Sequence, residues 1–82
     1  ENLEVNPNPV ENVLNFNFTT NYQGRFKVHI YSTNGKRIFS KPFIKNQKRF
    51  LGNIDLSKLK SGFYVIQIQY EDHQVMTQFI KI

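Results

Sequence analysis

The chain has 82 residues, of which 39% are hydrophobic and 15% aromatic, enough apolar mass for the core of one small domain and no more. A charged fraction of 21% excludes a typical disordered tail. The absence of cysteine excludes disulfides and thiolate metal sites, and no apolar run approaches the roughly 18 residues of a membrane helix.

The first part of the chain predicts two strands separated by a corner. Leu3 to Val5 forms a short strand, and Asn6-Pro7-Asn8-Pro9 then ends it, because the prolines lack backbone donors and force extended or turn geometry. From Val13 to Phe18, apolar residues alternate with asparagines, which indicates a strand with one solvated face. Thr19 to Gly24 follows as a polar loop.

A β-hairpin is predicted around Asn34-Gly35, which follows the alternating strand from Phe26 to Tyr31. Asn-Gly favours a type I′ turn, in which both central residues need positive φ. A two-residue loop would set Ile30 opposite Phe39 and Phe26 opposite Phe43. The same register sets Lys41 opposite Val28, and Pro42 follows it, so this strand should be bulged or lie at a sheet edge.

The longest clean alternation lies in Ile54 to Tyr70 and predicts a central strand around which the others pack. It follows a basic loop, Lys45 to Arg49, and a weak strand from Phe50 that Gly52 interrupts. Ser61-Gly62 supplies a turn before Tyr64. Tyr64 is either a tyrosine corner, with its hydroxyl bonded to backbone within the preceding turn, or a plain core aromatic residue.

The last strand is expected from Val75 to Ile82, after a turn at Glu71 to Gln74. If Asp72-His73 is the loop, Tyr70 pairs with Val75. The outer face then carries Met76, Ile80 and Ile82, near Val65 and Phe63. A shifted register, for which a bulge would suffice, turns Ile80 and Ile82 inward instead.

These elements predict an all-β protein, because no segment has a convincing helical period. About seven short strands separated by turns are typical of an antiparallel β-sandwich.

Candidate catalytic and metal-binding residues are sparse. His29 and His73 lie on different segments without a partner at ligand spacing, so no metal site is expected. Glu71 and Asp72 are adjacent in a turn, where two carboxylates are more often simply solvated than used as a general acid and base. Ser57 and Ser61 have no nearby histidine or nucleophile elbow. The chain is therefore expected to be neither an enzyme nor a cofactor-binding protein.

The net charge of +5 comes mainly from the middle of the chain. The cluster consists of Lys27, Lys36, Arg37, Lys41, Lys45, Lys48, Arg49, Lys58 and Lys60. Since the phenylalanines alternate as core residues and no RNP-type motif is present, we expect no nucleic-acid binding. An anionic lipid surface or an acidic partner suits this charge better, and lysines also keep edge strands from aggregating.

Four groups of residues, in this order and spacing, carry a resemblance that covers nearly the whole chain. They are Pro7-Asn8-Pro9-Val10 before Val13-Leu14; Val28-His29-Ile30-Tyr31 before Asn34-Gly35-Lys36; Ile54-Asp55-Leu56 through Leu59 and Gly62 to Tyr64-Val65-Ile66; and the final Lys81-Ile82. The chain resembles the C-terminal sorting domain, type A, of cargo of the type IX (Por) secretion system of Bacteroidota. It departs from that family at Asp72-His73, where Asn-Gly is frequent, and at Gln78, where a second lysine is common.

The resemblance implies an immunoglobulin-like, Greek-key sandwich at the end of a secreted protein. Residues 1–82 are thus expected to be a single C-terminal sorting domain cut from a longer chain, consistent with a start at Glu1. Such a domain directs its cargo through the periplasm and across the outer membrane to the surface, and a surface sortase usually removes it. The expected partners are the outer-membrane secretion machinery, including a shuttle protein and the sortase.

The resemblance also implies that the machinery reads the extreme C-terminus. The expected recognition residues are Phe79, Ile80, Lys81 and Ile82, which would offer a cation, an apolar anchor and a free carboxylate together. The alternative function is a non-catalytic carbohydrate-binding or spacer module attached to a secreted enzyme, with Tyr22 and Tyr31 as its outward aromatic residues.

Overall fold

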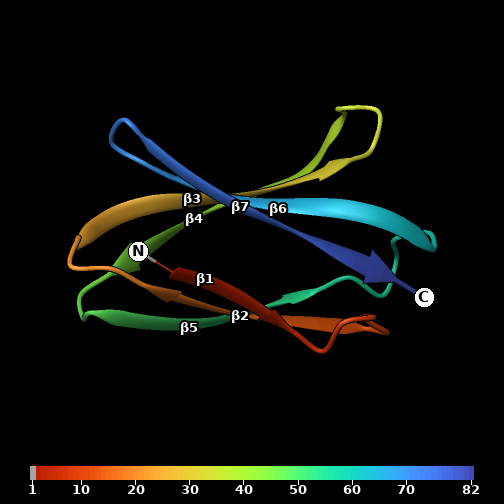
Figure 1. The fold of residues 1–82 in the computed structure, drawn as a ribbon, viewed down its shortest axis with the longest axis horizontal. Coiled ribbons are helices and arrows are strands. Elements are labelled where there is room, and N and C mark those ends of the chain that lie inside the picture. Colours follow the sequence, from red (N-terminus) through yellow and green to blue (C-terminus); the bar gives the residue numbers. More distant parts are fainter. Residues whose placement is uncertain (1) are drawn as a thin grey trace.

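The computed structural model describes residues 2–82, which form two antiparallel sheets packed face to face (Figure 1). One sheet has the strand order β1-β2-β5, and the other has the order β4-β3-β6-β7. The strands are β1 (Asn2–Asn6), β2 (Val13–Thr19), β3 (Gly24–Ser32), β4 (Arg37–Lys45), β5 (Arg49–Asp55), β6 (Gly62–Tyr70) and β7 (His73–Lys81).

The connections β2 to β3, β4 to β5 and β5 to β6 each pass from one sheet to the other, as in immunoglobulin-like sandwiches. The predicted seven-stranded β-sandwich is thus confirmed. β6 lies inside its sheet and β4 lies at an edge, also as predicted. No helix occurs among residues 2–82, and so no helix of that range could cross a membrane.

The core consists of the inward side chains of both sheets, and aromatic rings dominate one end of it. The ring of Phe26 lies 5.3 Å from that of Phe18 and 5.0 Å from that of Phe50, both edge-on. Edge-to-face contacts of this kind add stability beyond the area that the rings bury. The buried apolar residues are Val10, Leu14, Phe16, Phe18, Phe26, Val28, Ile30, Ile54, Leu56, Tyr64, Ile66, Ile68, Tyr70 and Phe79.

Gly52, which looked like an interruption of β5, has a packing function. It lies directly across from Phe16 on β2, and a Cβ placed at Gly52 would come within 2.5 Å of that ring. The missing side chain therefore leaves the space that the Phe16 ring fills.

The β3–β4 hairpin differs from the predicted type I′ turn. Gly35 has a positive φ of 84°, as expected, but Asn34 does not have a positive φ. The N–H of Gly35 donates to the Ser32 carbonyl oxygen at 3.0 Å, and the N–H of Ser32 donates to that of Lys36 at 2.9 Å. The loop therefore has three residues, in a geometry where only the glycine must be left-handed.

The strand pairs predicted for this hairpin are nevertheless correct. Ile30 lies opposite Phe39, and Val28 lies opposite Lys41. A β-bulge between Ile30 and Tyr31 takes up the extra loop residue and restores the register. Figure 1 shows the tip of this hairpin projecting away from the three-stranded sheet.

The register predicted for the last hairpin is wrong by two residues. Tyr70 pairs with His73 rather than with Val75, so Glu71 and Asp72 form the loop. Glu71 adopts a φ of 51°, a conformation that few residues other than glycine and asparagine favour. The ring of His73 stacks on that of Tyr70 at 5.2 Å, which explains why His73 belongs to the strand.

A shift of two residues leaves every side chain on its predicted face, because the side-chain period of a strand is two. Met76, Ile80 and Ile82 therefore belong to the outer face, as predicted, and the alternative inward register is wrong.

Tyr64 forms the predicted tyrosine corner. Its side chain is buried, and its hydroxyl donates to the main-chain oxygen of Lys60 at 2.7 Å. The bond fixes the turn between β5 and β6 to the start of β6. The interpretation of Tyr64 as a plain core residue is therefore wrong.

We expect Tyr64→Phe to lower the free energy of unfolding by about 1–2 kcal/mol without changing the fold, because the Lys60 carbonyl loses its donor. Urea unfolding followed by circular dichroism measures the change. Tyr31→Phe is the matched control, since the Tyr31 hydroxyl bonds only a side-chain oxygen, that of Gln67, at 3.3 Å. Equal stability of Tyr64→Phe and the parent chain would contradict this role.

Lys45 is a buried lysine that the sequence analysis placed in a basic surface loop. Its Nζ donates to the main-chain oxygens of Thr20 at 2.7 Å, Tyr22 at 3.1 Å, Lys48 at 2.5 Å, and Gln47. Burial lowers the pKa of Lys45 below that of a free lysine. Only the protonated ammonium supplies three N–H donors, so the surrounding main-chain oxygens favour the charged form of Lys45. The ammonium ties together the two loops that connect β2 to β3 and β4 to β5.

Replacing Lys45 by methionine should lower the free energy of unfolding by about 3 kcal/mol, because four main-chain oxygens around this buried position lose a charged donor at once. Thermal and urea unfolding measure the loss. Lys48→Met is the control, since that side chain is exposed, and it should change stability by less than about 0.5 kcal/mol. Similar effects of the two substitutions would rule out the ammonium as a tie between the loops.

Candidate recognition surface

The end of β7 lies beside the start of β6, and the two strands hold the predicted recognition residues in alternate orientations. Gly62 pairs with Lys81, Phe63 with Ile80, and Tyr64 with Phe79. Gly62 and Tyr64, which belong to the residues that carry the family resemblance, are thus cross-strand partners of the predicted recognition residues Lys81 and Phe79. The structure brings these parts of the sequence together at one corner of the sandwich.

Two of the four predicted recognition residues point inward. Phe79 is buried, and its ring stacks on that of Tyr64 with centroids 5.7 Å apart. Lys81 is also buried, and its Nζ donates to the main-chain oxygen of Ile82 at 2.7 Å. Lys81 was expected to offer a cation to the machinery, but the structure buries its side chain and leaves little of it exposed to solvent.

The outer face of the same corner is apolar and exposed. The exposed fraction is 63% for Phe63, 36% for Ile80 and 58% for Ile82. We call these three residues the tail face. Met76, which is 54% exposed, lies farther along the same face, opposite Gln67. Exposed apolar side chains gathered on one strand pair are typical of a surface that a partner covers.

The segment Pro7-Asn8-Pro9-Val10 also lies at this corner. Val10 is fully buried and forms a parallel bridge with Lys81. The N–H of Ile80 donates to Oδ1 of Asn8 at 2.9 Å. The prolines at positions 7 and 9 flank Asn8, and both Asn–Pro peptide bonds are cis. The contact of this segment with the last strand could not be predicted, because strand periodicity does not report which strand edges lie next to each other.

The other predicted motif, Asn34-Gly35, lies on the same sheet but not beside the tail face. The end of β3 that leads into it pairs with the start of β6, at Ser32 and Tyr64. In Figure 1 its hairpin tip projects upward from the sheet, while the end of β7 slopes down toward β1 and β2. Asn34 and Gly35 therefore shape a turn rather than the surface formed by the tail.

Next to the tail face, polar side chains cover the middle of the sheet. His29 lies on the outer face, as predicted, but its neighbours bury it, and its Nε2 lies 3.2 Å from Oε1 of Gln69. The hydroxyl of Tyr31 donates to Oε1 of Gln67, whose Nε2 donates to Oε1 of Gln74 at 3.0 Å. The glutamine and tyrosine side chains of this region thus bond one another, while Nδ1 of His29 is buried without a hydrogen-bond partner among residues 2–82.

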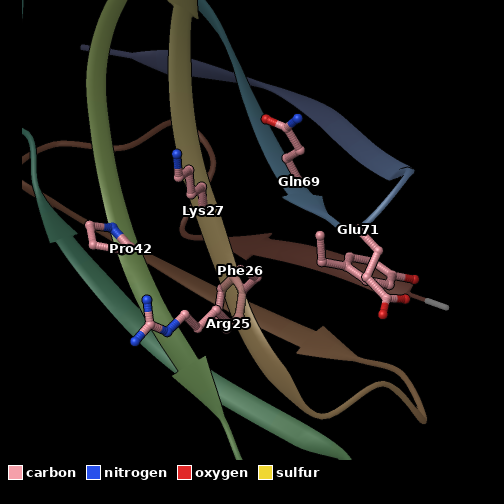
Figure 2. Close-up of a pocket in the computed structure, with 7 residues that line it drawn as sticks. Arg25, Phe26, Lys27, Pro42, Gln69 and Glu71 are labelled. Carbon is pink, nitrogen blue, oxygen red and sulfur yellow. The ribbon is translucent and has the colours of Figure 1, made fainter.

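A shallow hollow of about 280 Å³ lies at the opposite end of β6. Figure 2 shows it between Pro42 on β4, Lys27 and Arg25 on β3, and Gln69 and Glu71 at the end of β6. The charged ends of Arg25, Lys27 and Glu71 point in different directions. The hollow thus lacks the convergent polar groups of a ligand site.

Tyr22 and Tyr31 were the aromatic residues expected for a carbohydrate-binding module, and neither forms an exposed platform. Tyr22 packs on Tyr70 with ring centroids 4.5 Å apart, and its hydroxyl donates to the Arg25 main-chain oxygen at 2.6 Å. Tyr31 is half-buried. Among residues 2–82, no group of three histidine, aspartate or glutamate side chains could hold a metal ion.

Comparison with known proteins agrees with this arrangement. Over residues 4–82, the chain matches the family described as "Secretion system C-terminal sorting domain". No curated protein matches the chain. The fold defines the class of protein as a small immunoglobulin-like sandwich. The chain belongs to the family of secretion system C-terminal sorting domains, and the resemblance noted in the sequence is confirmed at this level.

Membership of this family assigns the function. The domain is a sorting signal for the type IX secretion system, and its cargo is directed toward the cell surface or the extracellular space. The family acts as a signal and not as a catalyst.

Proposed function

We propose that the chain is a type A sorting domain of a Bacteroidota protein, that residues 1–82 form one domain at the C-terminal end of a secreted cargo, and that the tail face is the part the secretion machinery reads. The route runs through the periplasm and across the outer membrane. The direct partners are a shuttle protein and a surface sortase that removes the domain.

The observation that carries the proposal is the exposed tail face, in which two of the residues expected from the sequence, Ile80 and Ile82, lie beside Phe63 of the neighbouring strand β6. Phe63 lies directly opposite Ile80, so the two side chains form one apolar pair, and Ile82 extends it along the strand. Leaving such groups in water is unfavourable, by about 25 cal/mol for each Å² of apolar surface. A partner that covers them recovers this free energy.

The burial of Phe79 and Lys81 refines the set of recognition residues. Phe79 supports recognition by fixing the face on which its neighbours lie, whereas Ile80 and Ile82 make the contact. Deletion of Phe79 to Ile82 would remove a core ring together with the contact residues. Single outward substitutions separate recognition from folding more cleanly.

The exposed basic residues suit a second, weaker contact. All members of the basic cluster except Lys45 are exposed. We propose that they bring the domain close to anionic lipid of the outer membrane, through attraction that salt screens. The contact is electrostatic and complements the apolar tail face.

A reporter carrying an export signal and this domain, expressed in a bacterium with the secretion machinery, tests the proposal. The double variant Phe63→Thr/Ile82→Thr should reduce surface delivery by at least about tenfold, because the loss of even one anchor residue of an interface has an effect of that order. Threonine keeps the preference for strand structure, so the unfolding midpoint of the domain should change little.

Leu51→Thr is the matched control. Leu51 lies on β5, and its exposed fraction of 66% is close to that of Phe63. This variant should be delivered as the parent is. Full delivery of Phe63→Thr/Ile82→Thr, or an equal loss with Leu51→Thr, would refute the tail face as the signal.

A further inference from the structure

The end of β7 is held by a segment that precedes it by some seventy residues in the chain. Three hydrogen bonds join the two: Ile80 N–H to Asn8 Oδ1 at 2.9 Å, Val10 N–H to the Ile80 oxygen at 2.7 Å, and Ile82 N–H to the Val10 oxygen at 2.9 Å. We call Asn8–Val10 the clasp. It lies along the edge of β7 that β6 does not occupy.

The clasp is anchored in the core, because the Val10 side chain is fully buried. It therefore acts as a fixed support for residues 80–82. These residues lie at the end of β7, which is an edge strand of its sheet and pairs with another strand, β6, on one side only. An unpaired strand end normally frays, since each exposed N–H and C=O can exchange its partner for water.

Pairing with the clasp also decides how a partner can approach. The backbone groups of Ile80 and Ile82 on this edge already have partners, so a strand cannot be added there while the clasp is closed. What remains accessible is the outward side chains of Ile80 and Ile82, held at fixed positions beside Phe63.

We propose that Asn8 is a positioning residue for sorting: with Val10, it holds the tail in the conformation that the machinery reads, so the signal consists of two segments far apart in sequence. This inference rests on the proposed function of the tail face. Asn8 is the member of the clasp whose side chain makes the hydrogen bond to β7, and Asn8 is exposed, whereas the buried Val10 side chain anchors the clasp in the core. Its substitution therefore removes the bond to Ile80 without opening a cavity.

The test uses the reporter fusion with Asn8→Ala, Asn8→Asp and the control Asn12→Ala. Asp retains an oxygen that accepts from the Ile80 N–H, whereas alanine does not. Asn12 is exposed and near the clasp, and its main-chain oxygen, which accepts from Leu56 N–H at 2.7 Å, is unaffected by the change. Hydrogen exchange of the C-terminal peptide of each purified fusion is measured together with surface delivery and the unfolding midpoint.

We expect Asn8→Ala to raise the exchange rate at Ile80 by about tenfold and to reduce surface delivery, with an unfolding midpoint close to that of the control. Asn8→Asp should restore both properties, and Asn12→Ala should change neither. Unchanged exchange in Asn8→Ala would overturn the clasp as a support for the tail.

Faster exchange with full delivery would overturn its role in sorting, while leaving the tail face intact as the signal. Failure of the proposed function itself has a different signature, which is full delivery of Phe63→Thr/Ile82→Thr. The two hypotheses can therefore fail separately.

Discussion

The packing of Phe79 against Tyr64 is the contact on which the presentation of the last strand depends. Both rings are buried, and Tyr64 is itself fixed by the bond from its hydroxyl to the Lys60 main-chain oxygen. Because side chains alternate along a strand, a buried Phe79 obliges Ile80 to face outward, and a buried Lys81 obliges Ile82 to do the same. The core of the sandwich thus determines which side chains a partner can meet.

The two ends of the sandwich are stabilised in different ways. At one end, the Lys45 ammonium gathers main-chain oxygens from the loops that connect the sheets. At the other, the clasp joins the segment before β2 to the end of β7. Beside the first arrangement stands one exposed apolar side chain, that of Ile44, which lies opposite Arg25. The second leaves Phe63 and Ile80 exposed as a cross-strand apolar pair, with Ile82 next to them. The paired apolar side chains favour the C-terminal corner as the place of recognition.

Much of this architecture could be predicted from the sequence, because it follows from local patterns. Alternation of apolar residues located the strands, and the side-chain period of two fixed the outer position of Ile80 even though the hairpin register was wrong by two residues. Turn type was harder, since Asn34-Gly35 suits both a type I′ turn and the bulged three-residue loop that the chain adopts. The choice depends on a bulge in the β3–β4 pair, which Lys41 and Pro42 indicated as one possibility but whose position between Ile30 and Tyr31 no local pattern predicted.

The remaining errors concern contacts between distant segments. Lys45 begins a basic stretch whose composition is typical of a surface loop. Its side chain is nevertheless buried, because four main-chain oxygens from two loops converge on its ammonium group. The clasp likewise depends on which strand lies at the edge of the sheet, and no local pattern encodes that order. Four recognition residues were predicted from the resemblance. Strand alternation left two registers open for Ile80 and Ile82, and the structure shows these two exposed and Phe79 and Lys81 buried.

The central claim is that the tail face, and not the opposite sheet, meets the secretion machinery. Site-specific photo-crosslinking in an exporting cell tests it most directly, with the photoreactive amino acid at Phe63 or at Leu51, whose exposed fractions of 63% and 66% are nearly equal. The account predicts crosslinks to a component of the secretion machinery from position 63 and none from position 51. Crosslinks from position 51 alone, or with equal yield from both, would contradict it.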